Sequence, residues 1–198
     1  MMNVVLVDSG GANIGSVRYA LERVGVKASV TNDAARIRRA SHVILPGVGA
    51  APEGMRRLRA YRLDGLLCEL RQPVLGICLG MQLLFECSDE GGVAGLGVLS
   101  GVVRRLSGQP GLRLPHMGWN RLYRKRDDDL LDGCEAFNGY TYFVHSFAAP
   151  VVADTVAICD YGGGFSAVVR RGNFCGMQFH PERSGPLGLR LLQNFLSL

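Results

Sequence analysis

The sequence lacks any long uninterrupted run of apolar residues. None of its 198 residues belongs to a stretch approaching the roughly 18 apolar residues that a membrane-spanning helix needs. The opening segment 1–11 has no basic region, and its apolar run is too short for a secretory signal. We therefore expect a cytoplasmic protein that makes no contact with a membrane.

Paired cysteines are also lacking. No C-x-x-C occurs, and the four histidines do not have the spacing of metal ligands, which argues against a zinc ribbon, a dithiol redox motif and a metal site. In a cytoplasmic α/β chain the cysteines should be free thiols. The six are Cys68, Cys78, Cys87, Cys134, Cys159 and Cys175.

Charge of one sign does not dominate. Lys and Arg number 22 against 17 Asp and Glu, a net charge of +5, and the arginines fall in short groups mixed with acidic residues. A nucleic-acid surface needs clustering on one element with interleaved aromatics, so we expect no nucleic-acid partner. The groups are mostly solvated faces, although a role in docking an acidic partner stays open. The phosphate-loop pattern G-x-x-x-x-G-K-[ST] is absent as well.

Apolar strand patterns alternate with helical patterns in the first 90 residues. The patterns predict strands over 3–8, 27–31, 42–45 and 74–77, and helices over 14–24, 33–39 and 55–70. Nearly continuous apolar strands that alternate with helices are typical of a parallel sheet covered on both faces.

The second half of the chain has frequent glycines and short β-like runs. These runs cover 101–106, 120–124, 140–147, 151–159, 165–170 and 174–179, and a final helix begins near Pro186. We expect them to extend the same sheet with antiparallel strands. The prediction is one domain over 1–198, a three-layer α/β/α fold with a largely parallel central sheet.

The stretch from Gly76 to Gly80, with the sequence GICLG, is the candidate for a nucleophile. It follows an apolar strand and precedes Met81, Leu84 and Phe85 at helical spacing, so Cys78 would lie on a sharp strand-to-helix turn. Flanking glycines leave room for such a turn, and a helix N-terminus favours a thiolate. The alternative is a buried structural cysteine between packing glycines.

A cysteine nucleophile needs a base, and His180 with Glu182 offers one. In an extended chain these two side chains share a face, so the carboxylate could orient the imidazole. For the oxyanion, one donor would be the N–H of Leu79 and another would come from the Pro46–Gly49 loop. The alternatives are a strand-end histidine beside a surface glutamate and an ordinary turn.

Three motifs in this order, LPGVG, GICLGMQ and QFHPE, resemble those of the class I glutamine amidotransferases. The resemblance implies that Cys78 attacks the carboxamide of glutamine, His180 transfers protons and Glu182 orients His180, without a cofactor. It places the oxyanion donors at Leu79 and in the loop at Val48 and Gly49. Contacts to glutamine would come from Gly49, Gln82, His145, Ser146 and Phe147.

Two further motifs, PHMGWN at 115–120 and YFVHSF at 142–147, resemble the branch of the family that serves histidine biosynthesis. That resemblance implies a heterodimer with a (β/α)8-barrel cyclase subunit. The cyclase would use the ammonia to form imidazole glycerol phosphate and an aminoimidazole carboxamide ribotide. Trp119, the only tryptophan, in an expected loop, suits an interface anchor. The interface candidates are Asn13, Trp119, Asn120 and Arg183.

Three other interpretations stay open. The chain could serve anthranilate, aminodeoxychorismate or pyridoxal phosphate synthesis, which PHMGWN disfavours. It could be a non-catalytic flavodoxin-like module that binds a nucleotide through Ser9–Gly15, although the spacing is not G-x-G-x-x-G. It could be a cysteine peptidase, which fits the triad but not the expected glutamine contacts.

Overall fold

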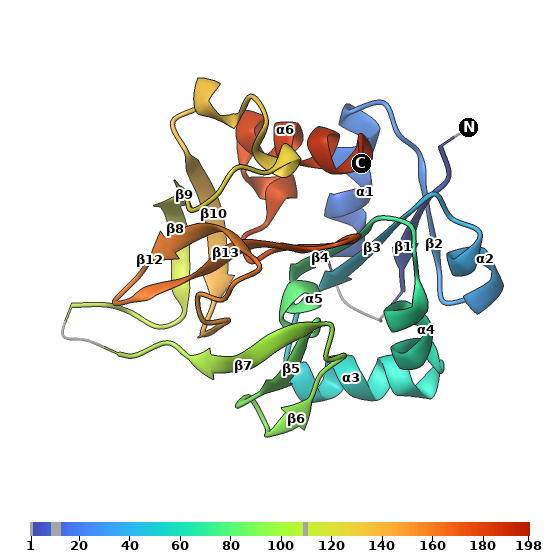
Figure 1. The fold of residues 1–198 in the computed structure, drawn as a ribbon, viewed down its shortest axis with the longest axis horizontal. Helices are drawn as coiled ribbons and strands as arrows, with labels where there is room; N and C mark the ends of the chain where they lie inside the picture. The colour runs from blue at the N-terminus through green and yellow to red at the C-terminus, as the bar shows by residue number, and fades with distance from the viewer. Residues whose placement is uncertain (1, 9–12, 109–110) are drawn as a thin grey trace.

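An eight-stranded mixed sheet forms the centre of the fold, with strand order β2-β1-β3-β4-β14-β13-β12-β9 (Figure 1). The computed structural model describes residues 2–8, 13–108 and 111–198, so part of the Ser9–Gly15 stretch lies outside the described residues. The parallel strands are β2 (Ala28–Thr31), β1 (Val4–Val7), β3 (His42–Gly47), β4 (Val74–Cys78) and β14 (Phe174–Met177). The antiparallel strands are β13 (Gly164–Arg171), β12 (Thr155–Asp160) and β9 (Tyr123–Arg124).

Helices cover both faces of this sheet, as the apolar strands predicted. Along β1, Val4 and Leu6 pack into one hydrophobic cluster while Val5 and Val7 pack into the other, because successive side chains point to opposite faces. One face is covered by α1 (Ile14–Arg23) and α6 (Gly185–Leu196). The opposite face carries α2 (Ala34–Arg38), α3 (Ala51–Ala60), α4 (Leu63–Glu69) and α5 (Leu79–Gln82), so the three layers are confirmed (Figure 1).

Several of the later strands do not join the central sheet, and this part of the prediction is wrong. One small sheet has the order β11-β7-β5-β6, formed by β11 (Phe147–Ala148), β7 (Leu99–Arg105), β5 (Phe85–Ser88) and β6 (Val93–Ala94). A two-stranded ribbon pairs β8 (His116–Arg121) with β10 (Tyr140–His145). Half-buried antiparallel strands read alike in sequence whichever sheet they join, so their partners were not predictable.

The helix after Cys78 is shorter than its apolar spacing predicted. It ends at Gln82, and Phe85 already belongs to β5. The carbonyls of Leu83 and Leu84 accept hydrogen bonds from the N–H groups of Leu96 and Leu99, at 2.8 and 2.9 Å. These long-range bonds replace those that a longer helix would make. The apolar side chains that suggested a helix are buried equally well in the strand, so their spacing did not distinguish the two structures.

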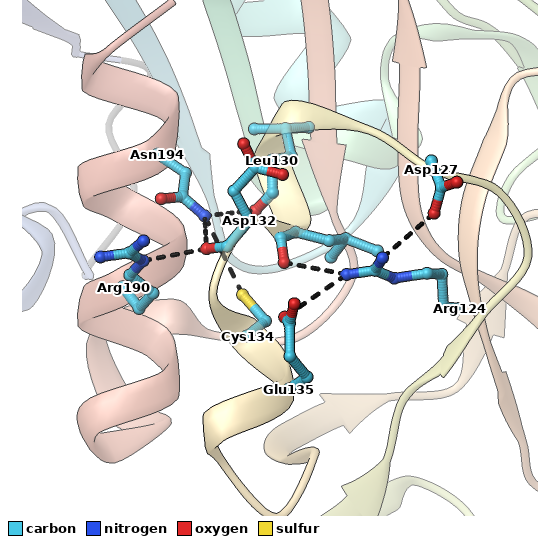
Figure 2. A network of polar contacts seen from close by, with 9 residues as sticks. Arg124, Asp127, Leu130, Asp132, Cys134, Glu135, Arg190 and Asn194 are labelled. Carbon is cyan, nitrogen blue, oxygen red and sulfur yellow. Dashed lines mark hydrogen bonds and ion pairs between the residues drawn. The ribbon is translucent and has the colours of Figure 1, made fainter.

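Polar contacts fasten the segment 124–136 to the last helix. The Asn194 amide of α6 donates to the carbonyls of Leu130 and Asp132, both at 2.9 Å, and Nε of Arg190 donates to the same Asp132 carbonyl at 2.9 Å (Figure 2). The segment contains two short 3-10 helices, η1 (Asp129–Leu131) and η2 (Cys134–Ala136). These bonds hold the return from β9 to β10 against α6.

No helix among the described residues is long and apolar enough to cross a membrane. The cytoplasmic location and the organisation of 1–198 as one domain stay predictions. All six cysteines are free thiols, as expected.

Candidate active site

Three neighbouring parallel strands bring the predicted catalytic segments together. In the order β3-β4-β14, the carboxyl ends lead to the Val48–Gly49 loop, to Cys78 and to the segment that begins at Gln178. Segments that follow adjacent parallel strands meet at one edge of the sheet, where α/β folds bind ligands. The topology thus unites residues distant in the sequence.

Cys78 occupies a strained turn between β4 and α5. Its backbone has φ 53° and ψ −111°, and its side chain is buried, with the residue 7% exposed. A Cβ on Gly76 would lie 2.6 Å from Gly80, and a Cβ on Gly80 would lie 1.8 Å from the carbonyl oxygen of Leu45. The prediction that glycines make room for the turn is therefore confirmed.

The four-residue length of α5 corrects one expectation about the sulfur. A single turn has little macrodipole, so the stabilisation of a thiolate that we expected from a helix falls to nearby groups instead. The first N–H groups of a helix still lack intrahelical partners, which keeps the Leu79 N–H a candidate donor for an oxyanion.

His180 and Glu182 form the expected pair. The Nδ1–H of His180 donates to Oε1 of Glu182 at 2.8 Å, with both side chains nearly inaccessible to solvent. Burial alone would lower the pKa of His180, but hydrogen bonds and charges from Cys78 and Glu182 outweigh it and raise the pKa to about 10. The imidazole is therefore held next to the sulfur of Cys78, where the base of a cysteine nucleophile would lie.

Asn13, predicted to lie at an interface, contacts this pair. Its amide donates to Oε1 of Glu182 and lies 3.2 Å from Nδ1 of His180. Because Nδ1 gives its hydrogen to Glu182, the bond that Asn13 makes is the one to the carboxylate. Asn13 therefore borders the triad itself and helps to fix the carboxylate that faces His180.

A cavity of about 490 Å³ opens above the sulfur and collects most of the predicted site residues. It is lined by Asn13, Val48, Gly49, Cys78, Leu79, Gln82, Glu90, Pro115, Val144, His145, Ser146, Phe147, His180 and Arg183. Trp119 and Asn120 are not among its lining residues. The sequence did not point to Glu90, and it assigned no role at the cavity to Pro115 or Val144, although both belong to the motifs at 115–120 and 142–147.

The fold and the motifs agree with known proteins. The family model for glutamine amidotransferase class-I matches residues 5–198. This chain belongs to the class I glutamine amidotransferase family. The amidotransferase is 59% identical over 198 residues to "Imidazole glycerol phosphate synthase subunit HisH" of Xanthomonas oryzae pv. oryzae (strain MAFF 311018), covering 100% of this chain and 98% of the relative. It is 54% identical over 202 residues to the HisH subunit of Xylella fastidiosa (strain Temecula1), with the same coverage.

Solved structures agree with the fold of the amidotransferase. A glutamine amidotransferase crystal structure superposes with a TM-score of 0.74 at 21% identity, covering 98% of each chain. The structure of PurLQS from Thermotoga maritima gives a TM-score of 0.72 at 20% identity, covering 100% of this chain and 99% of that one. At these identities the similarity supports the α/β architecture.

Two glutamines lie beside the sulfur of the amidotransferase, Gln82 at the cavity and Gln178 buried behind it. The amide of Gln82 donates to the carbonyl of Phe147 at 2.7 Å and to Oε1 of Gln178 at 3.0 Å. Gln178, fully buried, directs its own amide at Sγ of Cys78, 3.8 Å away. Gln178 lies in the QFHPE motif, but no role was predicted for it, because nothing in the motif shows that it reaches the sulfur.

The remaining interface candidates lie on the β8–β10 ribbon and beside it. Trp119 is in strand β8, which corrects the expected loop, and it is 56% exposed. Its ring packs edge-on against Tyr142 with centroids 5.9 Å apart, and the guanidinium of Arg183 lies 5.0 Å from the same tyrosine ring. Asn120, next along β8, is partly buried and bonds inward to the carbonyl of Asp160 at 2.9 Å.

Proposed function

We propose that this chain is the glutamine-hydrolysing subunit of an imidazole glycerol phosphate synthase in histidine biosynthesis. The observation that carries the proposal is the meeting of Cys78 and His180 at one cavity, with Glu182 bonded to His180 behind it, in a chain 59% identical to a HisH subunit over its whole length. The product ammonia passes to a cyclase subunit with a (β/α)8 barrel.

The first half of the reaction forms a thioester. Sγ of Cys78 attacks the carboxamide carbon of glutamine, and the carbonyl oxygen becomes an oxyanion. The N–H of Leu79 and an N–H of the Val48–Gly49 loop, both at the cavity, stabilise that charge. Collapse of the intermediate breaks the C–N bond, and the imidazolium of His180 gives its proton to the leaving nitrogen, which departs as ammonia.

The second half of the reaction restores the sulfur. Neutral His180 takes a proton from water, the hydroxyl attacks the thioester carbon, and glutamate leaves as the C–S bond breaks. Glu182 holds the imidazole in one orientation throughout and stabilises its protonated form. The two halves together convert glutamine and water into glutamate and ammonia.

Recognition of glutamine falls to the polar rim of the cavity. Gln82, Gly49 and the segment from His145 to Phe147 contact the substrate, as the family resemblance implies. Glu90 adds a negative charge at the same cavity, where its Oε2 accepts from the Ala51 N–H at 2.7 Å. The ammonium of an amino acid needs an anionic or carbonyl partner, and Glu90 supplies one.

The outer face of the β8–β10 ribbon suits a protein partner. Met117, Trp119 and Tyr140 are large, apolar and exposed there, and Tyr142 of the same ribbon packs against Arg183, which lines the cavity. Exposed aromatic and methionine side chains that cluster at one place are typical of interfaces. A cyclase docked on this face would lie beside the cavity, so ammonia could pass between subunits without entering bulk water.

Replacement of the nucleophile tests this function. Cys78→Ala should abolish glutamine-dependent synthesis of imidazole glycerol phosphate by the complex with the cyclase, while synthesis with added ammonia continues. Cys68→Ala, which changes an exposed cysteine outside the cavity, should leave both rates unchanged. Loss of ammonia-dependent synthesis in a folded Cys78→Ala complex would contradict this division of labour. Copurification of the chain with a chorismate-using enzyme would instead point to anthranilate or aminodeoxychorismate synthesis.

A further inference from the structure

Two buried histidines lie on the inner face of the β8–β10 ribbon, and neither takes part in the proton transfers above, although His145 also lines the cavity. His116 is 2% exposed and His145 is 6% exposed, and Nδ1 of His116 lies 3.0 Å from Nε2 of His145. The two residues face each other across the ribbon in its antiparallel register. His116 is also stacked against Tyr161, with ring centroids 3.9 Å apart.

The direction of each hydrogen bond in this pair is fixed by its ends. The carbonyl of Phe147 only accepts, so Nδ1 of His145, at 2.9 Å from it, carries a hydrogen. Nε2 of His145 is then an acceptor, and Nδ1 of His116 must donate to it. That leaves Nε2 of His116 to accept from the amide of Asn120, 3.3 Å away.

Both imidazoles are neutral in this arrangement, and their surroundings favour that form. Burial lowers the pKa of His145 to about 3 and that of His116 to about 4. A neutral imidazole has one donor and one acceptor nitrogen, so each ring donates a hydrogen bond on one side and accepts one on the other.

A shared acceptor, the carbonyl of Phe147, links this pair to the side chains that reach the sulfur of Cys78. The Phe147 carbonyl accepts from His145 and from Gln82, whose second N–H goes to Gln178. Since Oε1 of Gln178 is thereby an acceptor, its amide group faces Cys78. Gln82 has used both of its N–H groups, and its Oε1 is left to accept from a ligand.

We propose that His116 is a positioning residue and Gln178 a sulfur-contacting residue, joined by a relay through His145, the Phe147 carbonyl and Gln82. The relay fixes the orientation of both glutamine amides, so that one presents an N–H to Cys78 and the other presents an oxygen to glutamine. It begins at Asn120, next to Trp119 on the face proposed for the cyclase. The link between the relay and the cyclase rests on the proposed function, but the effect of the relay on the sulfur of Cys78 does not.

Alkylation of Cys78 by iodoacetamide measures the state of the sulfur without glutamine or a partner. His116→Phe keeps an aromatic ring against Tyr161 but removes both nitrogens. We expect it to slow alkylation at neutral pH about tenfold, as for the loss of one hydrogen bond, and to move the pH–rate profile to higher pH. His116→Gln, which retains a donor and an acceptor, should recover most of the rate. The modified peptide, followed by mass spectrometry, separates Cys78 from the other thiols.

His42→Phe is the matched control, because His42 is also buried but lies on β3, outside the relay. It should leave alkylation of Cys78 unchanged. A folded His116→Phe protein that reacts like the wild type would overturn the relay. If His116→Phe does not fold, Gln178→Met decides, since it removes the amide that faces Cys78 together with the oxygen that accepts from Gln82, and a wild-type rate there would equally reject the proposal.

Assays of the complex with the cyclase separate this inference from the proposed function. In a complex that hydrolyses glutamine, His116→Phe should lower kcat/KM for glutamine about tenfold and His42→Phe should not. A wild-type chain that does not hydrolyse glutamine with the cyclase would refute the proposed function alone. The alkylation rates would then still support or reject the relay.

Discussion

Cys78 holds a backbone conformation that is costly for any residue with a Cβ. Its φ of 53° places the sulfur at the apex of the turn, and such strain amounts to about 1–3 kcal/mol. Strand β3 and the start of α5 approach each other so closely at position 80 that only glycine fits there. This dense packing supports the turn. The strain is thus opposed by contacts of the neighbouring strand.

Gly80→Ala should therefore lower the free energy of unfolding by about 3 kcal/mol or more, since the added methyl would lie 1.8 Å from the Leu45 carbonyl oxygen. Urea denaturation of the full chain measures this change. Gly65→Ala is the matched control, because Gly65 lies in α4 with open space around it. It should gain about 0.5–1 kcal/mol from helix propensity. Equal stability of the two variants would contradict this account of the turn.

At the scale of single residues, the sequence pointed to the members of the proposed triad but not to the side chains that surround them. Cys78 and His180 were recognisable because motif and chemistry both point to them, and Gly76 and Gly80 because a sharp turn needs them. The roles of Gln178 and Glu90 depend on which side chains meet across strands and loops. Tertiary contacts of this kind leave no periodic pattern in the sequence.

The β8–β10 ribbon differs from the other elements in what its two faces carry. Its outer face has exposed apolar side chains, and its inner face has two buried imidazoles. The ribbon also touches the triad directly, because the backbone N–H of His180 donates to the carbonyl of Tyr142 at 2.9 Å. It therefore connects a candidate docking surface with His180, the proposed catalytic base.

Acid should destabilise the protein through the inner face of this ribbon. A buried histidine with a pKa lowered to about 4 stays neutral in the folded state, whereas the unfolded chain takes up a proton below about pH 6.5. Stability is then lost as pH falls, by about 2 kcal/mol for His116 at pH 5. His116→Phe should show a correspondingly smaller loss between pH 7 and pH 5 in urea denaturation. An equal loss in both proteins would show that His116 titrates normally.

The elements of the parallel core were predictable, and the ribbon was not. Strands buried on both faces are apolar throughout, so 3–8, 42–45 and 74–77 could be placed to within two residues of β1, β3 and β4. The pairing of His116 with His145 joins residues 29 positions apart. The register of that pairing depends on the intervening loop and the packing beneath it.

In the whole molecule, the cavity lies next to the outer face of the β8–β10 ribbon. Arg183 at the cavity and Trp119 on the ribbon pack against the same Tyr142 ring. A partner that covers the ribbon would thus contact residues adjoining the triad. This arrangement suits an enzyme whose product must be transferred rather than released.

Trp119→Ala should weaken the complex with the cyclase about thirtyfold or more, the effect of losing an interface anchor worth about 2 kcal/mol. Titration calorimetry measures the Kd. Tyr61→Ala is the control, because Tyr61 is similarly exposed, at 50%, but lies at the end of α3, away from the ribbon. An unchanged Kd for Trp119→Ala would place the cyclase on another surface.

The insertion of β14 between β4 and β13 has a consequence for how the protein is made. A nascent chain that has reached Arg171 has β4 paired on one side only, with an apolar strand edge open to association. It also holds Cys78 without His180, its proposed base. The residues that follow β14 supply that base, so the strand that closes the open edge and the completion of the proposed triad arrive together.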